Sequence, residues 1–227
     1  MTHDLLTPLQ KMALVLDAPI IITGTIKNYT DLKPSGIEES LNMLSSWWDI
    51  HSKSELEETL QWLDQEGGHT VVYHKVLDEL LPLTHVQQQA RVERAKKQDH
   101  KEGIRFKTAL QYLYDLSPAT IYAFDVARYV NLAKTGYSLD WFSEQELWSM
   151  LEEKARSITE KPVFATHEDY LLSFAVGRTF SMGHDSGTIK QTNENIKTLI
   201  TSPESPFVSY INWSTIVQEA QIKEGVE

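Results

Sequence analysis

The feature that most constrains this chain is a repeated helix-start signal followed by apolar residues at helical spacing. Residues 52–55 form a capping box, in which a hydroxyl and a carboxylate bond the free backbone amides at the start of a helix. Leu56, Leu60 and Leu63 follow at positions i, i+4 and i+7, which lie on one helical face. The same combination recurs at residues 143–158. This pattern predicts a chain that folds as helices packed around an apolar core.

Two short segments carry strand-like patterns instead. Residues 19–23 are apolar and β-branched, and residues 207–213 alternate weakly. We find no internal repeat and no convincing linker. We therefore expect an all-α or predominantly α fold, with residues 1–227 in a single compact multi-helix domain and at most one or two short peripheral strands. Within it, residues 84–105 are expected to be a polar basic helix or a mobile arm, and residues 181–206 to be rich in loops.

Charge is distributed unevenly along the chain. The formal net charge is −11, of which −8 falls in residues 1–83, +3 in residues 84–115 and −6 in the remainder. The pI near 5.2 argues against general binding to DNA, because like charges repel. No stretch approaches the ~20 apolar residues of a membrane span, and the N-terminus lacks the basic and apolar regions of a secretion signal. We expect a cytoplasmic protein with no membrane partner.

The sequence offers no familiar catalytic motif. Its lack of cysteine excludes a disulfide scaffold, a thiolate metal site and a cysteine nucleophile. Phosphate loops, dinucleotide fingerprints and zincin helices are also missing. Residues 183–187 place serine one position too late for a nucleophile elbow, and residues 167–169 point too far apart on a helix to bind one ion. We predict no catalytic residue, no metal site and no cofactor.

One polar set lies inside strongly apolar predicted helices. Asp125 and Arg128 are three residues apart and share a helix face, and burial would require that they find partners. Arg178 follows Gly177 in another apolar helix, where glycine is costly and a closely approaching backbone would explain it. With Glu146, these residues form either a structural polar core or a ligand-binding pocket. The sequence leaves both alternatives open.

Two charged stretches could contact a partner. An acidic surface in the first 83 residues would steer association with a basic protein. The basic stretch at residues 91–107 could bind an acidic protein or RNA, or could be a solvated helix face, and its first half lacks aromatic residues for base stacking. The candidate partner-binding residues are Glu55, Glu57, Glu58, Asp64, Glu66, Arg91, Arg94 and Lys97.

Several segments together resemble a known bacterial family. They are residues 48–50, 60–69, 123–133, 141–148, 177–181 and 205–213. Residues 123–128 (AFDVAR), for example, are similar to the family's "aWDlaR" segment. The chain resembles the family called domain of unknown function 1266, which includes the YbeU- and YbeR-like proteins, and looks like a divergent member because Phe124 and Ser181 stand where tryptophan is usual. The resemblance implies a compact bacterial helical domain and no reaction.

These observations predict a protein-binding module, such as an immunity-like or inhibitor-like partner of a basic protein. The absence of catalytic motifs favours binding over catalysis. The alternatives are an enzyme or small-ligand binder that uses the Asp/Arg/Glu set, and RNA binding through residues 91–107. The sequence leaves the identity of the partner and the oligomeric state open.

Overall fold

Helices make up the regular structure of the protein. The computed structural model describes residues 6–21, 26–66, 68–159, 163–183 and 186–224, and these residues contain no strand. The all-α prediction is therefore confirmed. The elements are α1 (Pro8–Val15), α2 (Ile26–Thr30), α3 (Ile37–Met43), η2 (Leu44–Trp48), α4 (Lys53–Gln61), η3 (Trp62–Glu66), α5 (Gly68–Leu80), α6 (His85–Gln98), α7 (His100–Gln111), α8 (Tyr122–Ser138), α9 (Glu144–Thr159), α10 (His167–Met182), α11 (Ser186–Thr201), α12 (Pro206–Ser209) and α13 (Trp213–Glu224). In the described part of the chain, no helix is long and apolar enough to cross a membrane.

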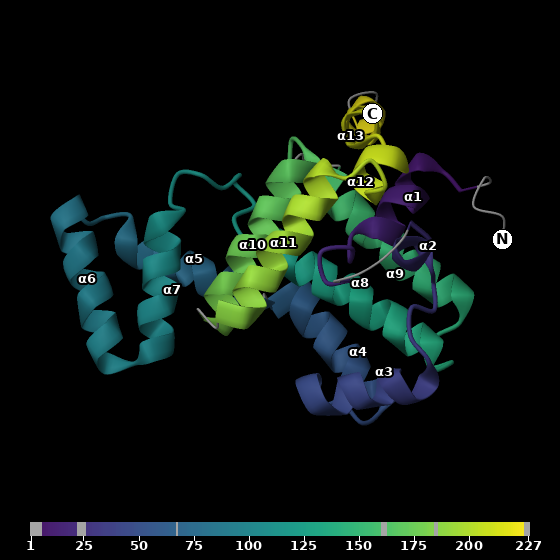
Figure 1. Cartoon of the computed structure of the whole chain (residues 1–227), viewed down its shortest axis with the longest axis horizontal. Coiled ribbons are helices and arrows are strands. Elements are labelled where there is room, and N and C mark those ends of the chain that lie inside the picture. Colours follow the sequence, from purple (N-terminus) through teal and green to yellow (C-terminus); the bar gives the residue numbers. More distant parts are fainter. Residues whose placement is uncertain (1–5, 22–25, 67, 160–162, 184–185, 225–227) are drawn as a thin grey trace.

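Helix α8 lies at the centre of the fold (Figure 1). It packs against α9 and α10 and is also contacted by α4, α5 and η3. It can be surrounded in this way because its residues are apolar on nearly every side. Gly177 in α10 allows close packing, since a Cβ there would lie 2.5 Å from the Cβ of Phe124 in α8. The close approach predicted at Gly177 is thus confirmed, but side-chain atoms of α8 make it and not a backbone.

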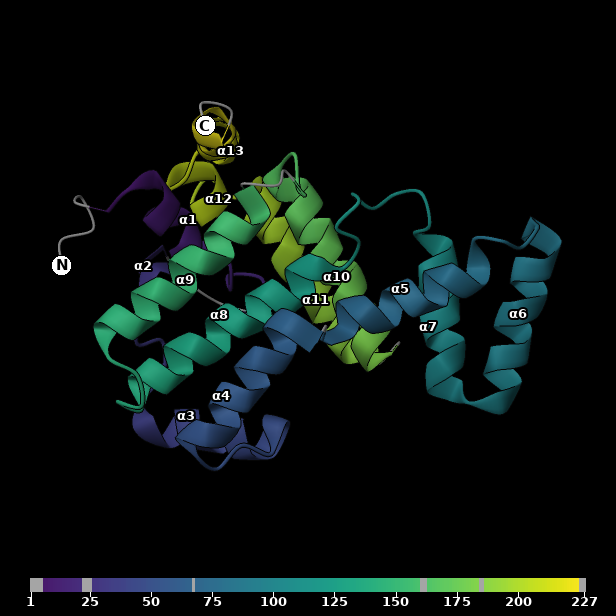
Figure 2. The same ribbon diagram turned by 180° about the vertical axis from the view of Figure 1, so that it is seen from behind.

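Helices α6 and α7 form an antiparallel hairpin at one end of the molecule (Figures 1 and 2). Asp99 separates the two helices and caps α7, because its side chain accepts a bond of 2.8 Å from the backbone N–H of Glu102. Gly103 lets the helices meet closely, since a Cβ there would lie 2.6 Å from the Cα of Lys96. Of the two alternatives predicted for residues 84–105, the structure shows the helix.

Three other local predictions need correction. Residues 207–213 do not form a strand: Ser205 caps the short helix α12, Pro206 occupies its first position, and α13 begins at Trp213. Residues 19–20 form a turn, and residues 22–25 lie outside the described part. Residues 181–206 are not mainly loops, because α11 occupies 186–201 and buries Thr192, Asn195 and Leu199 on one face.

Two π-helical turns, η2 and η3, shape the region that covers α8. They continue directly from α3 and α4, respectively. Trp48 is the last residue of η2, and Trp62 is the first residue of η3. Such π turns interrupt the regular helical repeat and are frequent at functional sites. Both turns lead to the polar cluster described next.

Candidate functional site

Asp125, in the first turn of α8, caps the start of α5. Its Oδ1 accepts a hydrogen bond from the backbone N–H of His69 (3.1 Å), and its Oδ2 accepts from the backbone N–H (2.8 Å) and hydroxyl (2.6 Å) of Thr70. The first amides of a helix have no acceptor within that helix, and the helix dipole favours a negative charge there. The carboxylate therefore joins two helices that are more than 50 residues apart in sequence.

The protonation of Asp125 reflects these bonds. The side chain is only 1% exposed. Burial raises the pKa of Asp125, but the hydrogen bonds from His69 and Thr70 outweigh burial, and the pKa is lower than the ordinary value. The carboxylate is thus charged at neutral pH.

Gly68 makes room for this carboxylate. A Cβ at Gly68 would lie 2.5 Å from Oδ1 of Asp125, which is shorter than van der Waals contact allows. The residue also has φ of +33°, in the region that favours glycine. Both observations explain why the helix α5 begins with glycine.

Arg128, His69 and Ser181 form a chain of hydrogen bonds beside Asp125. Nη1 of Arg128 lies 2.7 Å from Nδ1 of His69 and 3.4 Å from Oδ1 of Asp125. Nε2 of His69 lies 2.6 Å from the hydroxyl of Ser181 in α10. The cluster thus brings together α5, α8 and α10.

The residue types resemble a Ser-His-Asp triad, but the bonding is different. Arginine has no acceptor, so Nδ1 of His69 must accept from Arg128, and the ring carries its proton on Nε2. Nε2–H then donates to Ser181 and cannot remove the proton of its hydroxyl. The distance from Nδ1 of His69 to Oδ1 of Asp125, 3.7 Å, is also too long for the orienting hydrogen bond of a triad.

Aromatic rings surround the guanidinium of Arg128. Its Cζ lies 4.4 Å from the ring centre of Trp48, 4.8 Å from that of Phe124 and 5.9 Å from that of Trp62. Burial lowers the pKa of Arg128 to about 10, against the opposing effect of Asp125, so the group stays charged at neutral pH. Cation–π contacts with Trp48 and Trp62 tie both π turns to α8.

The other residues of the predicted polar core lie apart from this cluster. Glu146 is exposed and caps α9, where its carboxylate accepts a bond of 2.6 Å from the backbone N–H of Ser143. It follows the far end of α8, and the thirteen residue-to-residue steps from Asp125 to Ser138 span ~20 Å of helix. Burial lowers the pKa of Arg178, whose Nε has no hydrogen-bond partner among the described residues. The surface hollows at the base of the hairpin and beside α9 contain none of these residues.

The predicted acidic residues fall mainly in one exposed part of the chain. Residues 37–66 contain eight acidic residues and a single lysine. We call the surface of α3, η2 and α4 the acidic face; its exposed acidic side chains are Glu38, Glu39, Asp49, Glu55, Glu57 and Glu58. Asp64 instead pairs with the buried Lys154, and the side chain of Glu66 lies outside the described part. Glu58 is exposed and makes no ion pair in the described structure. Glu57 is exposed but lies 3.7 Å from Nζ of Lys53, and Glu55 accepts a hydrogen bond of 2.6 Å from the backbone N–H of His51. Asp64 is engaged within the fold.

The acidic face also exposes large apolar side chains. Trp47 is 73% exposed, Ile37 is 61% exposed, and Leu41 is 45% exposed. Ile37 and Leu41 are four residues apart in α3 and so lie one above the other on its surface. A tryptophan exposed to this degree beside several carboxylates distinguishes the face from an ordinary solvated surface.

The basic residues of the hairpin divide into engaged and free groups. Arg91 pairs with Glu79 and stacks on Phe106, while Lys96 pairs with Glu93 and Arg105 with Glu102. Within the described structure, no ion pair engages Arg94, Lys97, Lys101 or Lys107. Of the predicted partner-binding cations, Arg94 and Lys97 are thus exposed and free, and Arg91 is not.

One buried ion pair escaped the sequence analysis. Lys134 of α8 and Asp17, which follows α1, are both 0% exposed, with 2.8 Å between Nζ and Oδ1. Nζ also donates to the carbonyl oxygens of Leu14 (2.7 Å) and Tyr29 (3.3 Å). Burial raises the pKa of Asp17, although Lys134 opposes the shift. The signal for this pair was the single lysine in α8, most of whose residues are buried, and the pair anchors α1.

No metal centre is evident at these sites. The described residues contain no group of three histidine, aspartate or glutamate side chains placed to hold an ion. His167 stacks on Phe207, with 5.8 Å between ring centres, and Asp169 forms a capping box with Thr166. Residues 167–169 therefore serve the start of α10.

Comparison with known proteins gives one match. The model of a family described as "Protein of unknown function (DUF1266)" matches residues 43–214. No curated protein and no solved structure matches the chain. The matched range includes Trp48, Trp62, His69, Arg128 and Ser181, and so all of the polar cluster.

Proposed function

The chain belongs to the DUF1266 family, and we propose that it is a protein-binding module whose acidic face binds a basic protein, in the manner of an immunity or inhibitor protein. The observation that carries the proposal is the exposure of Trp47 among the carboxylates of α3 and α4. Tryptophan is enriched at the energetic centres of protein interfaces. Carboxylates around such an anchor would select and steer a positively charged partner.

The charges of the acidic face are largely uncompensated. Lys53, the one lysine in residues 37–66, lies 3.7 Å from Glu57 and 3.9 Å from Glu146. Glu38 and Glu58 make no ion pair with any described residue. Mutual repulsion of such carboxylates is unfavourable in the free protein, and a basic partner would relieve it.

The elements that carry the acidic face are packed on buried residues of the core. Leu44, Leu56 and Leu60 are buried against Leu132 and Phe142. Arg128 holds Trp48, the neighbour of Trp47, through its cation–π contact. A surface fixed in this way loses little conformational entropy on binding, which favours affinity.

No observation favours the two alternative functions. The bonding of His69 leaves Ser181 without a base, which opposes a hydrolytic role for the polar cluster. Three of the seven cations in the hairpin are engaged by glutamates, and its cationic surface is correspondingly weak for binding RNA.

The proposal can be tested by partner capture with matched variants. The tagged full-length protein is immobilised and exposed to an extract of the source organism at low salt, and retained proteins are identified by mass spectrometry. We expect basic proteins to be retained by the wild type, to be released at 0.5 M salt, and to be lost with Trp47→Ala/Glu57→Gln/Glu58→Gln. Glu194→Gln/Glu204→Gln, which removes two exposed carboxylates elsewhere, is the control and should retain them.

The proposal fails if the triple variant retains the same proteins as the wild type, or if no protein is retained in a salt-sensitive way. Circular dichroism of each variant shows whether the fold is intact, so a loss of capture cannot be confused with unfolding.

A further inference from the structure

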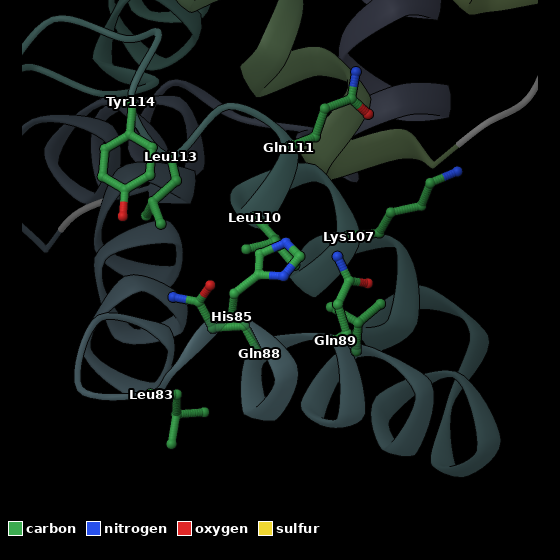
Figure 3. Close-up of a pocket in the computed structure, with 10 residues that line it drawn as sticks. Leu83, His85, Gln88, Gln89, Lys107, Leu110, Gln111, Leu113 and Tyr114 are labelled. Atoms are coloured by element: carbon green, nitrogen blue, oxygen red, sulfur yellow. The ribbon is translucent and has the colours of Figure 1, made fainter.

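The α6–α7 hairpin carries an uncovered hollow at the end where it joins the rest of the molecule. The hollow has a volume of about 500 Å³ and is lined by both helices and by the segments that precede and follow them. Figure 3 shows Tyr114 at one side and Lys107 at the other, with Leu110 and His85 between them. It thus combines apolar side chains with three glutamines and with basic or protonatable groups.

Exposed apolar side chains occur at this hollow and next to it in sequence. Tyr114, which is 86% exposed, lines the hollow together with Leu83 and Leu113. Val86 (78% exposed) and Leu81 (57% exposed) are close in sequence to lining residues. Large apolar side chains exposed in this way favour contact with another molecule, since water contact with them is unfavourable.

The charge of the hairpin restricts what can cover the hollow. Residues 85–111 contain seven lysines and arginines and three acidic residues. Lys107 lines the hollow, and Arg94 and Lys97 are exposed on α6 without an ion pair in the described structure. The occupant that fits is an acidic element with apolar anchors.

The acidic face of this same chain has those properties. In α3 and η2, the anchors Ile37, Leu41 and Trp47 are exposed beside Glu38 and Glu39. Within one molecule the two surfaces cannot meet, because the hairpin projects at one end while α3 and α4 lie beneath α8 (Figures 1 and 2). The complementary surfaces can therefore meet only between molecules.

We infer that the acidic face of one copy docks on the hairpin hollow of a second copy, so that the protein associates head to tail. The inference rests on the proposed function, since it uses the acidic face as the binding surface and names the basic hairpin of a second copy as one of the surfaces that it binds. The interface is heterologous, because it joins two different surfaces. An open assembly keeps one free acidic face at one end and one free hairpin at the other, so association continues beyond the dimer unless a ring closes.

Salt should weaken this association. Each chain carries a net charge of −11, so two copies repel each other at long range. At 0.1 M salt the Debye length is about 10 Å, which screens most of this repulsion but leaves contacts between adjacent charges. A further increase in salt concentration therefore mainly weakens the contacts between opposite charges on the two copies.

The test uses the full chain and two variants, each of which disables one surface. Trp47→Ala/Glu38→Gln disables the acidic face, and Tyr114→Ala/Lys107→Gln disables the hairpin. Sedimentation velocity from 1 to 200 μM follows the size of each sample at 0.1 M salt. Val208→Ala, on an exposed apolar residue away from both surfaces, is the control, and circular dichroism confirms folding.

We expect the wild type and Val208→Ala to grow beyond dimers with concentration and to dissociate in 0.5 M salt. Each variant alone should associate at least ~10-fold more weakly, as expected for loss of an aromatic anchor. An equimolar mixture of the two variants should recover a dimer and no larger species, because only one intact pair of surfaces remains.

The inference is overturned if the wild type stays monomeric at 200 μM, if either variant alone associates like the wild type, or if the mixture stays monomeric. These failures are distinguishable from failure of the proposed function. A monomeric wild type that still loses its basic partners on Trp47→Ala would remove self-association alone. In partner capture, Tyr114→Ala/Lys107→Gln should retain foreign basic proteins, because its acidic face is intact.

Discussion

Replacing Asp125 with alanine should destabilise the protein more than any exposed capping residue does. The substitution removes the acceptor of the His69 and Thr70 amides and of the Thr70 hydroxyl. It also leaves Arg128 charged, mostly buried and without its carboxylate partner. The effect therefore has a local part, at the start of α5, and an electrostatic part.

The two parts contribute different amounts to the loss of folding free energy. Loss of a helix cap costs about 1 kcal/mol, and removal of one member of a buried ion pair costs about 3–5 kcal/mol. Arg128 keeps 14% exposure and aromatic contacts, so the electrostatic part should fall at the lower end of that range. We expect a total loss of about 3–4 kcal/mol, which lowers Tm by roughly 6–16 °C for a chain of this size.

Urea unfolding followed by circular dichroism measures the loss, with Glu146→Ala as the matched control. Glu146 also caps a helix, but it is exposed and faces no buried cation, so its loss should cost only about 1 kcal/mol. In a double-mutant cycle, Arg128→Met should recover at least ~1 kcal/mol in the Asp125→Ala background, since the stranded charge is gone. Equal losses for Asp125→Ala and Glu146→Ala, together with no coupling to Arg128, would refute this account.

The pH dependence gives a second check on Asp125. Its pKa is lower in the folded state than in the unfolded state, so its contribution to stability is present above an unfolded pKa of about 4. The contribution is lost as the pH falls through the lower folded pKa. The difference in free energy of unfolding between wild type and Asp125→Asn should accordingly shrink below pH ~4 and be constant from pH 6 to 8.

Three further substitutions test other parts of the structure. Gly68→Ala should lower stability by about 2–3 kcal/mol, because it combines a positive φ with a clash against a carboxylate; a thermal melt like that of the wild type would contradict this. Lys134→Met strands the carboxylate of Asp17 and should cost about 3–5 kcal/mol at pH 7. Because burial raises the pKa of Asp17, the stranded carboxyl is protonated more easily at pH 5, and the loss of stability should be smaller there than at pH 7. A loss of stability that increases as the pH falls would contradict this account. Ser181→Ala should cost about 1 kcal/mol, and the Ser181 hydroxyl of the wild type should resist labelling by a fluorophosphonate, so labelled Ser181 in a mass spectrum would contradict the tautomer assigned to His69.

The sequence predicted helices and local neighbours well. Asp125 and Arg128 were expected to share a face and to be buried, and the structure confirms both. Gly177 was expected to allow a close approach, and Phe124 makes it. Capping boxes at residues 143–146 and 166–169 are present with both of their bonds. The capping boxes depend on contacts within a few residues, and the shared face of Asp125 and Arg128 depends on the shape of one helix. At Gly177 the sequence predicted a close approach but not which residue makes it.

Partners that are distant in sequence could not be predicted in this way. Helical spacing shows which side of a helix is buried but not which helix faces it. Glu146 was grouped with Asp125 in one predicted polar core or pocket, yet the length of α8 separates them. His69 and Ser181, which do reach the cluster, lie 56 residues on each side of Asp125 and gave no local signal for it. Burial of Asp17 beside Lys134 likewise depends on how α1 crosses α8.

The location of the polar cluster affects how the family resemblance should be interpreted. Residues that carry the resemblance, such as Trp48, His69 and Arg128, bond or stack with one another inside the fold. Their polar groups are largely engaged there, and so they are better suited to hold the π turns than to bind a free ligand. The exposed groups that a partner would contact, such as Trp47, lie on the surface that this cluster supports and not in the cluster itself. The family resemblance therefore concerns residues that hold the π turns in place, whereas the exposed side chains of the acidic face, on which the proposed binding depends, lie outside the polar cluster.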